Sequence, residues 1–425
     1  MKNKQLIHNP ESVNVVFDVD VLGLGYVYPK ARTGVFRVTE ELLRSFLENP
    51  KLNVYFASKN NLSDSIAFFQ EAEIETTGRF MHSKQELNVA QSINRFRSVF
   101  LGNKFLEKLF RKIRFTFFHK TSNFSEFPDK TVFFSSYNEL PAEVKGDPSL
   151  KKVILIHDLI SFRLPELFEE SNRRDVRKSI ESIDENTTLV CVSKSTKKDL
   201  KEFFPRIKNS VRVIPLAANK KLFYKVENKA KIDHALKKYN IPNRPYLLSL
   251  STLEPRKNIE TTIKAFNKLL KEHHEINASL VLVGTLGWNY NTIFSEILNS
   301  NTIKDKLIVT GFVKDKDLAT LYSGATGFIY PSLYEGFGLP PLEAMQCGVP
   351  VVVSNSSSIP EVVGEAGIYT EPMDKIAIKD AMEMLLTDRV YAKELSQKSI
   401  AQAANFSWRN SVNKYVKIFQ ELVAE

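Results

Sequence analysis

Two glutamates, Glu335 and Glu343, lie on either side of a loop that contains Gly336 and Gly338. Carboxylates accept hydrogen bonds from hydroxyl groups, such as those of a sugar or a ribose. A helix is expected to begin near Pro341, directly after the loop. A glycine loop that enters a helix presents free N–H groups and the positive end of the helix dipole. The spacing therefore predicts an anion site, suited to a diphosphate, beside two hydroxyl-binding carboxylates.

A pair of cations, Arg256 and Lys257, follows a second predicted strand, Tyr246–Ser251, and precedes a predicted helix, Ile259–Leu270. Ligands of open α/β sheets bind at the carboxyl ends of strands. Arginine offers a planar fork and lysine a point charge, a combination that suits a diphosphate. The alternative is a solvated basic turn. The neighbouring glycine loop favours the diphosphate interpretation.

His157 and Asp158 stand at the carboxyl end of the predicted strand Lys152–His157, and Ser193 stands at an equivalent strand end. Strand ends of this kind form the functional edge of an open sheet. A structural role is the alternative: His157 would cap its strand, and Ser193 would be the N-cap of a predicted helix, Thr196–Phe204.

Gly34 lies at a further helix start, in the segment Arg32–Arg37. A long loop, Val19–Ala31, is expected before it, and the helix Val38–Phe46 after it. A single glycine is a weak signal, so Gly34 is only a candidate for the edge of a binding site.

No residue pattern predicts a metal site. Asp18 and Asp20 have the Asp-x-Asp spelling of a metal clamp, but they end the first predicted strand, and we interpret them as a coincidence. The seven histidines show no ligand spacing. The two cysteines, Cys191 and Cys347, exclude a disulfide framework and a four-cysteine zinc site.

Short apolar runs alternate with helix-like stretches along the whole chain, which predicts a parallel α/β sheet covered on both faces. The expected strands are Val13–Asp18, Asn53–Ala57, Thr131–Ser135, Lys152–His157, Thr188–Ser193, Val211–Pro215, Tyr246–Ser251, Ser279–Gly284, Leu307–Thr310, Gly327–Tyr330 and Pro350–Val353.

The chain of 425 residues is longer than one hydrophobic core usually supports. The alternation stops in a polar stretch with one short helix, Ala230–Tyr239, before Pro245. We therefore expect two Rossmann-like, doubly wound domains that face each other across a cleft. Their predicted extents are residues 1–220 and 245–405, with a linker at 221–244 and a C-terminal packing helix at 406–425.

The formal net charge of +10 favours anionic partners. Aromatic and leucine residues alternate with lysine and arginine between residues 95 and 120, as in a helix on an anionic membrane surface. A surface helix with its apolar side in the core is the alternative. The start, Met1–Pro10, lacks an apolar core, so we expect no secretory signal. A cytoplasmic location, with peripheral contact at the inner face of a membrane, follows as an expectation.

The segment from about residue 246 to 370 resembles the retaining nucleotide-sugar glycosyltransferases of family 4, which have the GT-B architecture. The resemblance is carried by STLEPRKNIETTIKAF, LVLVGTLGW and YEGFGLPPLEAMQCGVPVVV. In the first half, HDLI, VSKSTKKDL and VIPLAAN are similar to the same family but weaker, and residues 58–125 show no match.

The resemblance implies roles that follow the parts of the substrates. The donor sugar would contact Glu335, Gly336 and Phe337, and the diphosphate would contact Arg256, Lys257, Gly338 and Leu339. The ribose would contact Glu343, and the base would contact Phe312 and Val313. The catalytic residues would be His157, beside the reacting centre, and Glu335, while the acceptor or phosphate side would include Gly34, Asp158 and Ser193. The family often has a glycine-rich turn where this chain has only Gly34, and this departure leaves the acceptor side open.

The implied reaction transfers a sugar with retention, without a metal or cofactor and without a stable covalent intermediate. Similarity to mannosyltransferase-type members favours GDP-mannose as the donor and a glycan or lipid-linked acceptor in cell-surface polysaccharide synthesis. The alternatives are a nucleotide-sugar epimerase of the same architecture, a sugar-polymer phosphorylase, and a basic protein that binds nucleic acid or membrane without catalysis. No pyridoxal-phosphate lysine is identifiable, and only residues 95–120 could support nucleic-acid binding, so no nucleic-acid partner is expected.

Overall fold

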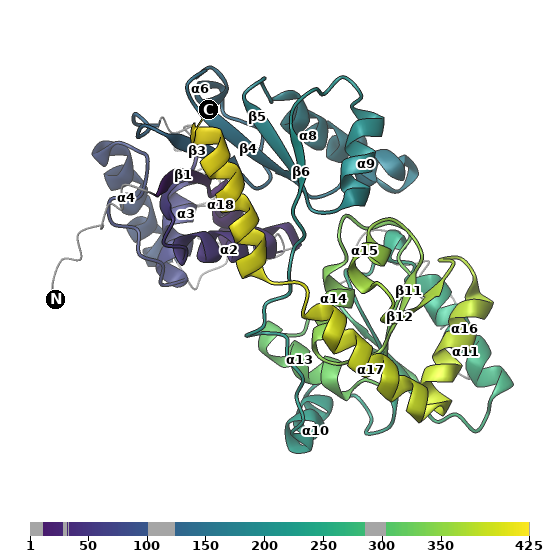
Figure 1. Cartoon of the computed structure of the whole chain (residues 1–425). Coiled ribbons are helices and arrows are strands. Elements are labelled where there is room, and N and C mark those ends of the chain that lie inside the picture. The colour runs from purple at the N-terminus through teal and green to yellow at the C-terminus, as the bar shows by residue number, and fades with distance from the viewer. Residues whose placement is uncertain (1–11, 29–31, 33, 101–123, 285–302, 425) are drawn as a thin grey trace.

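The computed structural model describes residues 12–28, 32, 34–100, 124–284 and 303–424 (Figure 1). These residues contain two six-stranded sheets in which every pairing is parallel. The strand order is β2-β1-β3-β4-β5-β6 in the first sheet and β12-β11-β10-β7-β8-β9 in the second. The order reverses direction within each sheet, which opens a crevice at the carboxyl ends of the strands. The predicted doubly wound architecture is confirmed.

The strands have the following bounds. They are β1 Val13–Asp18, β2 Leu52–Ala57, β3 Thr131–Ser135, β4 Lys151–Ile156, β5 Thr187–Cys191, β6 Val211–Val213, β7 Tyr246–Leu250, β8 Ser279–Val283, β9 Leu307–Gly311, β10 Gly327–Tyr330, β11 Val351–Ser354 and β12 Gly367–Thr370. Each predicted strand is present. The prediction missed β12, whose four residues form a partly exposed edge strand without a long apolar run.

Helices lie between the strands. They are α1 Asp20–Val27, α2 Gly34–Leu47, α3 Leu62–Glu71, α4 Lys84–Phe100, α6 Ala142–Lys145, α7 Ile160–Arg163, α8 Glu170–Glu181, α9 Lys194–Phe203, α10 Lys229–Lys238, α11 Ile259–Glu272, α13 Asp315–Gly324, α14 Leu339–Gln346, α15 Ile359–Val363, α16 Lys375–Thr387, α17 Arg389–Ala403 and α18 Trp408–Ala424, with 3₁₀ turns at η2 Pro165–Leu167 and η3 Pro255–Lys257.

The long loop predicted at Val19–Ala31 was wrong, because it contains the helix α1. Glycine lowers helix propensity, so Gly23 and Gly25 hid this helix from the sequence. Both are needed for packing: a Cβ on Gly25 would collide with the Phe36 ring, and one on Gly23 would lie 2.6 Å from Ser65 Oγ. Tertiary contacts therefore stabilise a helix that propensity disfavours.

The C-terminal helix α18 returns to the first sheet, where it lies beside α2 (yellow in Figure 1). Its residues Tyr415 and Phe419 pack with Phe46 of α2 and Phe134 of β3 at ring-centroid distances of 5.4–6.2 Å. The predicted packing helix thus completes the core of the first sheet.

The helix predicted inside the linker is α10, and it packs against α13 beside the second sheet. The Tyr239 hydroxyl, just after α10, donates a hydrogen bond to Asp317 Oδ2 at 2.7 Å, and Lys238 forms an ion pair with the same carboxylate. The segment 221–244 therefore has its own contacts with the second half.

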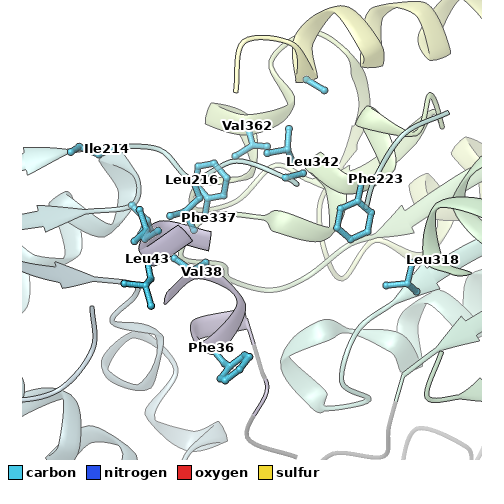
Figure 2. Packing of buried hydrophobic residues seen from close by; sticks show 14 of the residues in the cluster. Phe36, Val38, Leu43, Ile214, Leu216, Phe223, Leu318, Phe337, Leu342 and Val362 are labelled. Carbon is cyan, nitrogen blue, oxygen red and sulfur yellow. The ribbon is translucent and has the colours of Figure 1, made fainter. Parts of the chain in front are cut away.

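One apolar cluster extends from the first sheet to the second (Figure 2). Val38 and Leu43 contribute from α2, Phe223 from the segment between the sheets, and Leu342 and Val362 from α14 and α15. The cluster thus joins α2 of the first half with α14 and α15 of the second, and the polar residues described next lie beside it.

Candidate functional site

The carboxylate of Glu335 is held by four side chains, which with it form the Glu335 cluster: Arg256, Lys257, Tyr330 and Ser332. Lys257 Nζ, Tyr330 Oη and Ser332 Oγ donate to Glu335 Oε1 at 2.7, 2.7 and 2.6 Å. Arg256 Nη1 lies 2.9 Å from Oε2. Glu335 is 8% exposed, so these donors replace the water that a buried carboxylate requires.

The end of β7 positions the two cations. The chain leaves β7 and turns through η3, whose last residue is Lys257. Asn258 follows with a φ of 56°, a left-handed conformation that asparagine tolerates, and its Nδ2 donates to the Pro331 carbonyl at 3.0 Å. This bond ties the turn to the loop after β10 that carries Glu335. Both segments lie at strand carboxyl ends, as predicted.

Burial would raise the pKa of Glu335, but the charges of Arg256 and Lys257 lower it to about 2. Burial and the neighbouring Arg256 lower the pKa of Lys257, against the effect of Glu335. Glu254 also contacts Arg256, with Oε1 2.6 Å from Nη2. Two cations therefore face two carboxylates, and the local charge is close to balanced.

The helix α14 begins at Leu339, two residues before the predicted start. Gly338 precedes it with a φ of +111°, a backbone conformation that side chains disfavour. Gly348 follows its C-cap with a φ of +75°, in the predicted position. A helix that began at Pro341 would have Glu343 in its first turn, and this prediction was wrong: because the helix begins early, Glu343 lies in its second turn. The helix start remains open toward the loop.

Glu343 has its own environment, separate from the Glu335 cluster. Its Oε2 accepts a hydrogen bond from the Tyr322 hydroxyl at 3.2 Å, and its Oε1 lies 3.3 Å from Arg37 Nη2. Burial raises the pKa of Glu343, while Arg37 acts to lower it. Arg37 lies on α2 in the first half, so the pair links the two halves.

Gly336 brings the glycine loop against the carboxyl end of β4. A Cβ at this position would collide with the His157 carbonyl oxygen and lie 2.7 Å from Asp158 Cβ. Thr196 Oγ1, on α9, donates to the Gly336 carbonyl at 3.1 Å. The structure thus brings together the predicted residues Glu335, Gly336, His157 and Asp158 from opposite halves of the chain.

The His157 ring is held by its backbone surroundings. Its Nε2 lies 2.8 Å from the Ser136 carbonyl oxygen, and this contact requires a proton on Nε2. Burial lowers the pKa of His157, which favours the neutral ring. The Asp158 carboxylate accepts from the backbone N–H of Ile160 at 3.1 Å and fixes the turn after β4.

The remaining candidates differ in their surroundings. Ser193 Oγ accepts from the Thr196 N–H at 2.9 Å, which is the N-cap role that the sequence left open. Gly34 is the exposed first residue of α2, and no atom of the described residues lies within 4 Å of an added Cβ. Phe312 is 69% exposed, whereas Val313 is buried.

A second set of contacts, the interdomain clasp, joins α9 of the first half to the second half. It consists of Tyr334 and Glu361 on one side and Asp199 with the start of α9 on the other. The backbone N–H groups of Lys194 and Ser195 donate to the Glu361 carboxylate at 2.8 and 2.7 Å. A carboxylate at a helix N-terminus is stabilised by the unpaired N–H groups and the dipole.

Two large cavities adjoin these residues. One, of about 830 Å³, is lined by α2, the segment 217–223, Asp315, Leu339 and Glu343. The other, of about 920 Å³, lies at the carboxyl ends of β1, β3 and β4, and His157, Asp158 and Tyr137 line it. The candidate residues therefore border spaces large enough for small-molecule ligands.

Sequence reasoning missed Arg37, Tyr330, Ser332 and Glu254. Tyr330 ends a predicted strand, and Ser332 and Glu254 flank the predicted motifs, so their closeness to strand ends was the available signal. Arg37 was part of a quoted segment, but its partner lies more than three hundred residues away along the chain.

Within the described residues, no group of three or more His, Cys, Asp or Glu side chains is arranged to hold a metal ion. No helix in the same part of the chain is long and apolar enough to cross a membrane. Residues 101–120 of the predicted membrane segment 95–120 lie outside the described residues. Residues 285–288, the end of the LVLVGTLGW motif, also lie outside them.

Residues 231–405 match the family described as Glycosyl transferases group 1. Over 273 residues the chain is 34% identical to O-antigen chain mannosyltransferase B of Escherichia coli, a match that covers 64% of this chain and 71% of that protein. It is 32% identical over 276 residues to the serotype-specific mannosyltransferase WbdA of Escherichia coli, which covers 64% of this chain and 34% of that protein, so the chain spans about a third of this relative.

The fold is similar to that of sucrose-phosphate synthase from Thermosynechococcus elongatus, with a TM-score of 0.66. The similarity covers 97% of this chain and 99% of that one at 18% sequence identity. At this identity the likeness shows the shared fold alone.

Proposed function

The chain belongs to the group 1 glycosyltransferases and has their GT-B fold, and on this basis we propose that it transfers mannose from GDP-mannose, with retention, to a glycan or lipid-linked acceptor. Its similarity to an O-antigen chain mannosyltransferase supports both the sugar and a role in polysaccharide synthesis. The donor base and sugar are part of the proposal.

The diphosphate of the donor would lie between the Glu335 cluster and the start of α14. Arg256 and Lys257 supply the positive charge. At the start of α14, Leu339 supplies a backbone N–H group, because Pro340 and Pro341 have none and the Leu342 N–H already bonds to the Gly338 carbonyl. The helix dipole adds positive potential, and Gly338 lets the ligand approach the backbone closely. In the structure both cations contact Glu335, so a diphosphate would compete with this carboxylate for them.

The sugar and the nucleoside would lie on either side of the diphosphate. Glu335, released in part from its cations, would accept hydrogen bonds from the sugar hydroxyls beside Gly336 and Phe337. Glu343 would accept those of the ribose. The exposed ring of Phe312 is available to stack on the base, while the side chain of the neighbouring Val313 is buried.

In the transfer step, the bond between the anomeric carbon and the diphosphate oxygen breaks, and the acceptor oxygen forms a bond on the same face. The acceptor proton passes to the leaving phosphate oxygen, so charge and protons balance. Arg256 and Lys257 stabilise the charge that develops on the leaving group. His157, a neutral ring that carries its proton on Nε2, would border the reacting carbon from the other half. We expect this step to need no metal ion.

The acceptor would enter the cavity of about 920 Å³ at the carboxyl ends of β1, β3 and β4. His157 and Asp158 lie at its boundary with the Gly336 loop. Tyr137, 46% exposed, offers an aromatic face for a sugar ring, and Asn138 and Asp175 offer hydrogen-bonding groups for hydroxyls. A neutral glycan end suits this lining. Ser193 and Gly34 would act indirectly, through the start of α9 and the start of α2.

We propose that the protein works in the cytoplasm, in contact with the inner face of a membrane where a lipid-linked acceptor is presented. The basic segment 95–120 would provide the contact. Binding to anionic vesicles that weakens as salt is added, and that RNA does not compete for, would support this part of the proposal.

The observation that carries the donor assignment is the convergence of Arg256 and Lys257, which follow β7, with Glu335, which follows β10. It can be tested by calorimetry with GDP, UDP, ADP and dTDP on the full chain. We expect GDP to bind best of the four nucleotides. Arg256→Gln should weaken the affinity for GDP by ten- to a hundredfold, about 1.4 kcal/mol for each factor of ten, and should leave the affinity for the free nucleoside unchanged. Arg244→Gln is the matched control, because Arg244 bonds, among the described residues, to Ser279, Asn277 and the Asp305 carbonyl and not to the Glu335 cluster. Equal binding by wild type and Arg256→Gln would contradict the diphosphate site.

A further inference from the structure

Arg37 reaches from α2 in the first half to Glu343 on α14 in the second. The ion pair joins Nη2 to Oε1 at 3.3 Å, and the Glu343 side chain is only 4% exposed, against 31% for Arg37. A carboxylate buried to this extent requires a counter-charge or strong hydrogen bonds. Here the counter-charge comes from the opposite half of the molecule.

We propose that Arg37 is a positioning residue for the nucleotide, and that it keeps the Glu343 carboxylate ionised and oriented to accept hydrogen bonds from the ribose. The inference rests on the proposed function, because it takes Glu343 as the ribose ligand. Arg37 itself need not touch the substrate; it acts through Glu343.

The Arg37 guanidinium is held in place by an aromatic ring. Its Cζ lies 5.4 Å from the ring centroid of Phe223, within reach of a cation–π contact. Phe223 is buried in the segment between the sheets (Figure 2) and packs against Tyr322 with the ring centroids 6.1 Å apart. Tyr322 in turn donates to Glu343. The four residues therefore form a closed set of contacts that includes both halves and the segment between them.

The charges around Glu343 come from three elements. On α13, Tyr322 donates a hydrogen bond, and Asp315 raises the pKa of Glu343; directly after α14, Glu343 raises the pKa of the buried Cys347 thiol. On α2, Arg37 acts to lower that pKa and Glu41 faces Arg37. The cavity of about 830 Å³ that Glu343 and Arg37 border is also lined by Lys220, Lys221 and Arg409. Within this set, Arg37 is the cation in ion-pair contact with Glu343.

This arrangement makes the ribose site depend on the approach of α2 to α14. When the halves separate, Glu343 loses the Arg37 guanidinium that orients it; where Arg37 is removed and Glu343 stays buried, burial favours the protonated acid. A neutral carboxyl group is a poorer acceptor for two ribose hydroxyls than a carboxylate. The nucleotide would therefore bind best when the two halves are together.

The test is calorimetric titration of the full chain with GDP over a pH series from mildly acidic to mildly basic. Arg37→Gln should weaken binding about tenfold near neutral pH, which corresponds to about 1.4 kcal/mol. Removal of Arg37 should raise the pKa of Glu343. As the solution is acidified, the Arg37→Gln variant should therefore lose its affinity for GDP at a higher pH than the wild type does, and it should regain affinity when the pH is raised. Arg37→Lys should restore part of the affinity because it restores the charge.

Two further variants separate the possible roles of Arg37. In a Glu343→Gln background, Arg37→Gln should cause no additional loss, because the two residues act as one unit. Arg212→Gln is the control, since Arg212 forms a similar but exposed pair with Glu421 at 3.6 Å. Melting temperatures of all variants verify that each one is folded.

An unchanged affinity and pH profile in Arg37→Gln would overturn the inference. So would a loss of equal size at every pH that persists in the Glu343→Gln background, because that pattern indicates direct contact with the phosphates. Failure of the proposed function looks different: the wild-type protein itself would bind no nucleoside diphosphate, and the role of Arg37 would fall with it.

Discussion

The Tyr334 hydroxyl donates to the Asp199 carboxylate, with Oη 2.8 Å from Oδ2 and 2.9 Å from Oδ1. Tyr334 directly precedes Glu335, and Asp199 lies on α9 of the other half. Arg163 approaches the same carboxylate at 2.7 Å. The loop that carries the proposed sugar ligand is thus fastened to the acceptor half one residue away from that ligand.

Weakening the interdomain clasp should favour a more open enzyme. Tyr334→Phe removes the hydrogen bond to Asp199, and Glu361→Gln removes the negative charge at the start of α9. A hydrogen bond to a charged group contributes roughly 1.5–3 kcal/mol, so we expect KM for both substrates to rise about tenfold or more, with a smaller change in kcat. Small-angle scattering should show a larger radius of gyration. The exposed Glu365→Gln is the control; unchanged KM and radius in both clasp variants would contradict the prediction.

Glu335→Gln should abolish most of the turnover without loss of nucleotide binding. The amide keeps the shape but not the charge that holds sugar hydroxyls, and we expect kcat to fall about a hundredfold or more, on the order of 3 kcal/mol. The affinity for GDP should stay equal or increase, because Arg256 and Lys257 lose a competing carboxylate. Glu260→Gln, at the exposed partner of Lys264, is the control. A variant that turns over normally would exclude a role for Glu335.

Acid stability should depend on the same residue. Folding lowers the pKa of Glu335 from 4.5 to about 2, so its ionised form stabilises the fold fully above about pH 4.5. This contribution, on the order of 3 kcal/mol, is lost as the pH falls through 2. The free energies of unfolding of the wild type and of Glu335→Gln, measured by denaturant titration, should therefore differ most at neutral pH and become equal in acid. A difference that is constant with pH would show that the Glu335 charge is not the cause.

Gly336→Ala should disturb the contact between the halves and leave each core intact. The added methyl group would collide with the His157 carbonyl oxygen, a backbone atom that cannot rotate away. We expect activity to fall by at least tenfold while the far-ultraviolet dichroism is unchanged. Gly146→Ala is the control, because its methyl would meet only the Ala142 carbonyl at 3.2 Å. Full activity in Gly336→Ala would mean that the halves work at a greater distance than the structure shows.

The strands and the main site motifs could be predicted because their signals are local. An apolar run such as Val351–Ser354 is enough to predict a buried parallel strand. The turn with Arg256 and Lys257 follows a strand end, and its position does not depend on which residues it contacts. The helix α1 could not be predicted, since its glycines fit only against Phe36 and Ser65. The pairing of Arg37 with Glu343 also escaped, because it depends on how two separate sheets pack together. Ser193 shows the limit of position alone: a strand-end residue became a helix cap.

The return of α18 to the first sheet has a consequence for biosynthesis. The core that begins with Val13 on β1 is closed by Tyr415 and Phe419, which a ribosome adds only after the last strand of the second sheet. The second sheet, by contrast, has all its strands by residue 370. The half made first must therefore wait, with Phe46 and Phe134 uncovered, until the half made second has left the exit tunnel. Chaperone dependence should thus be concentrated in the N-terminal half of the nascent chain.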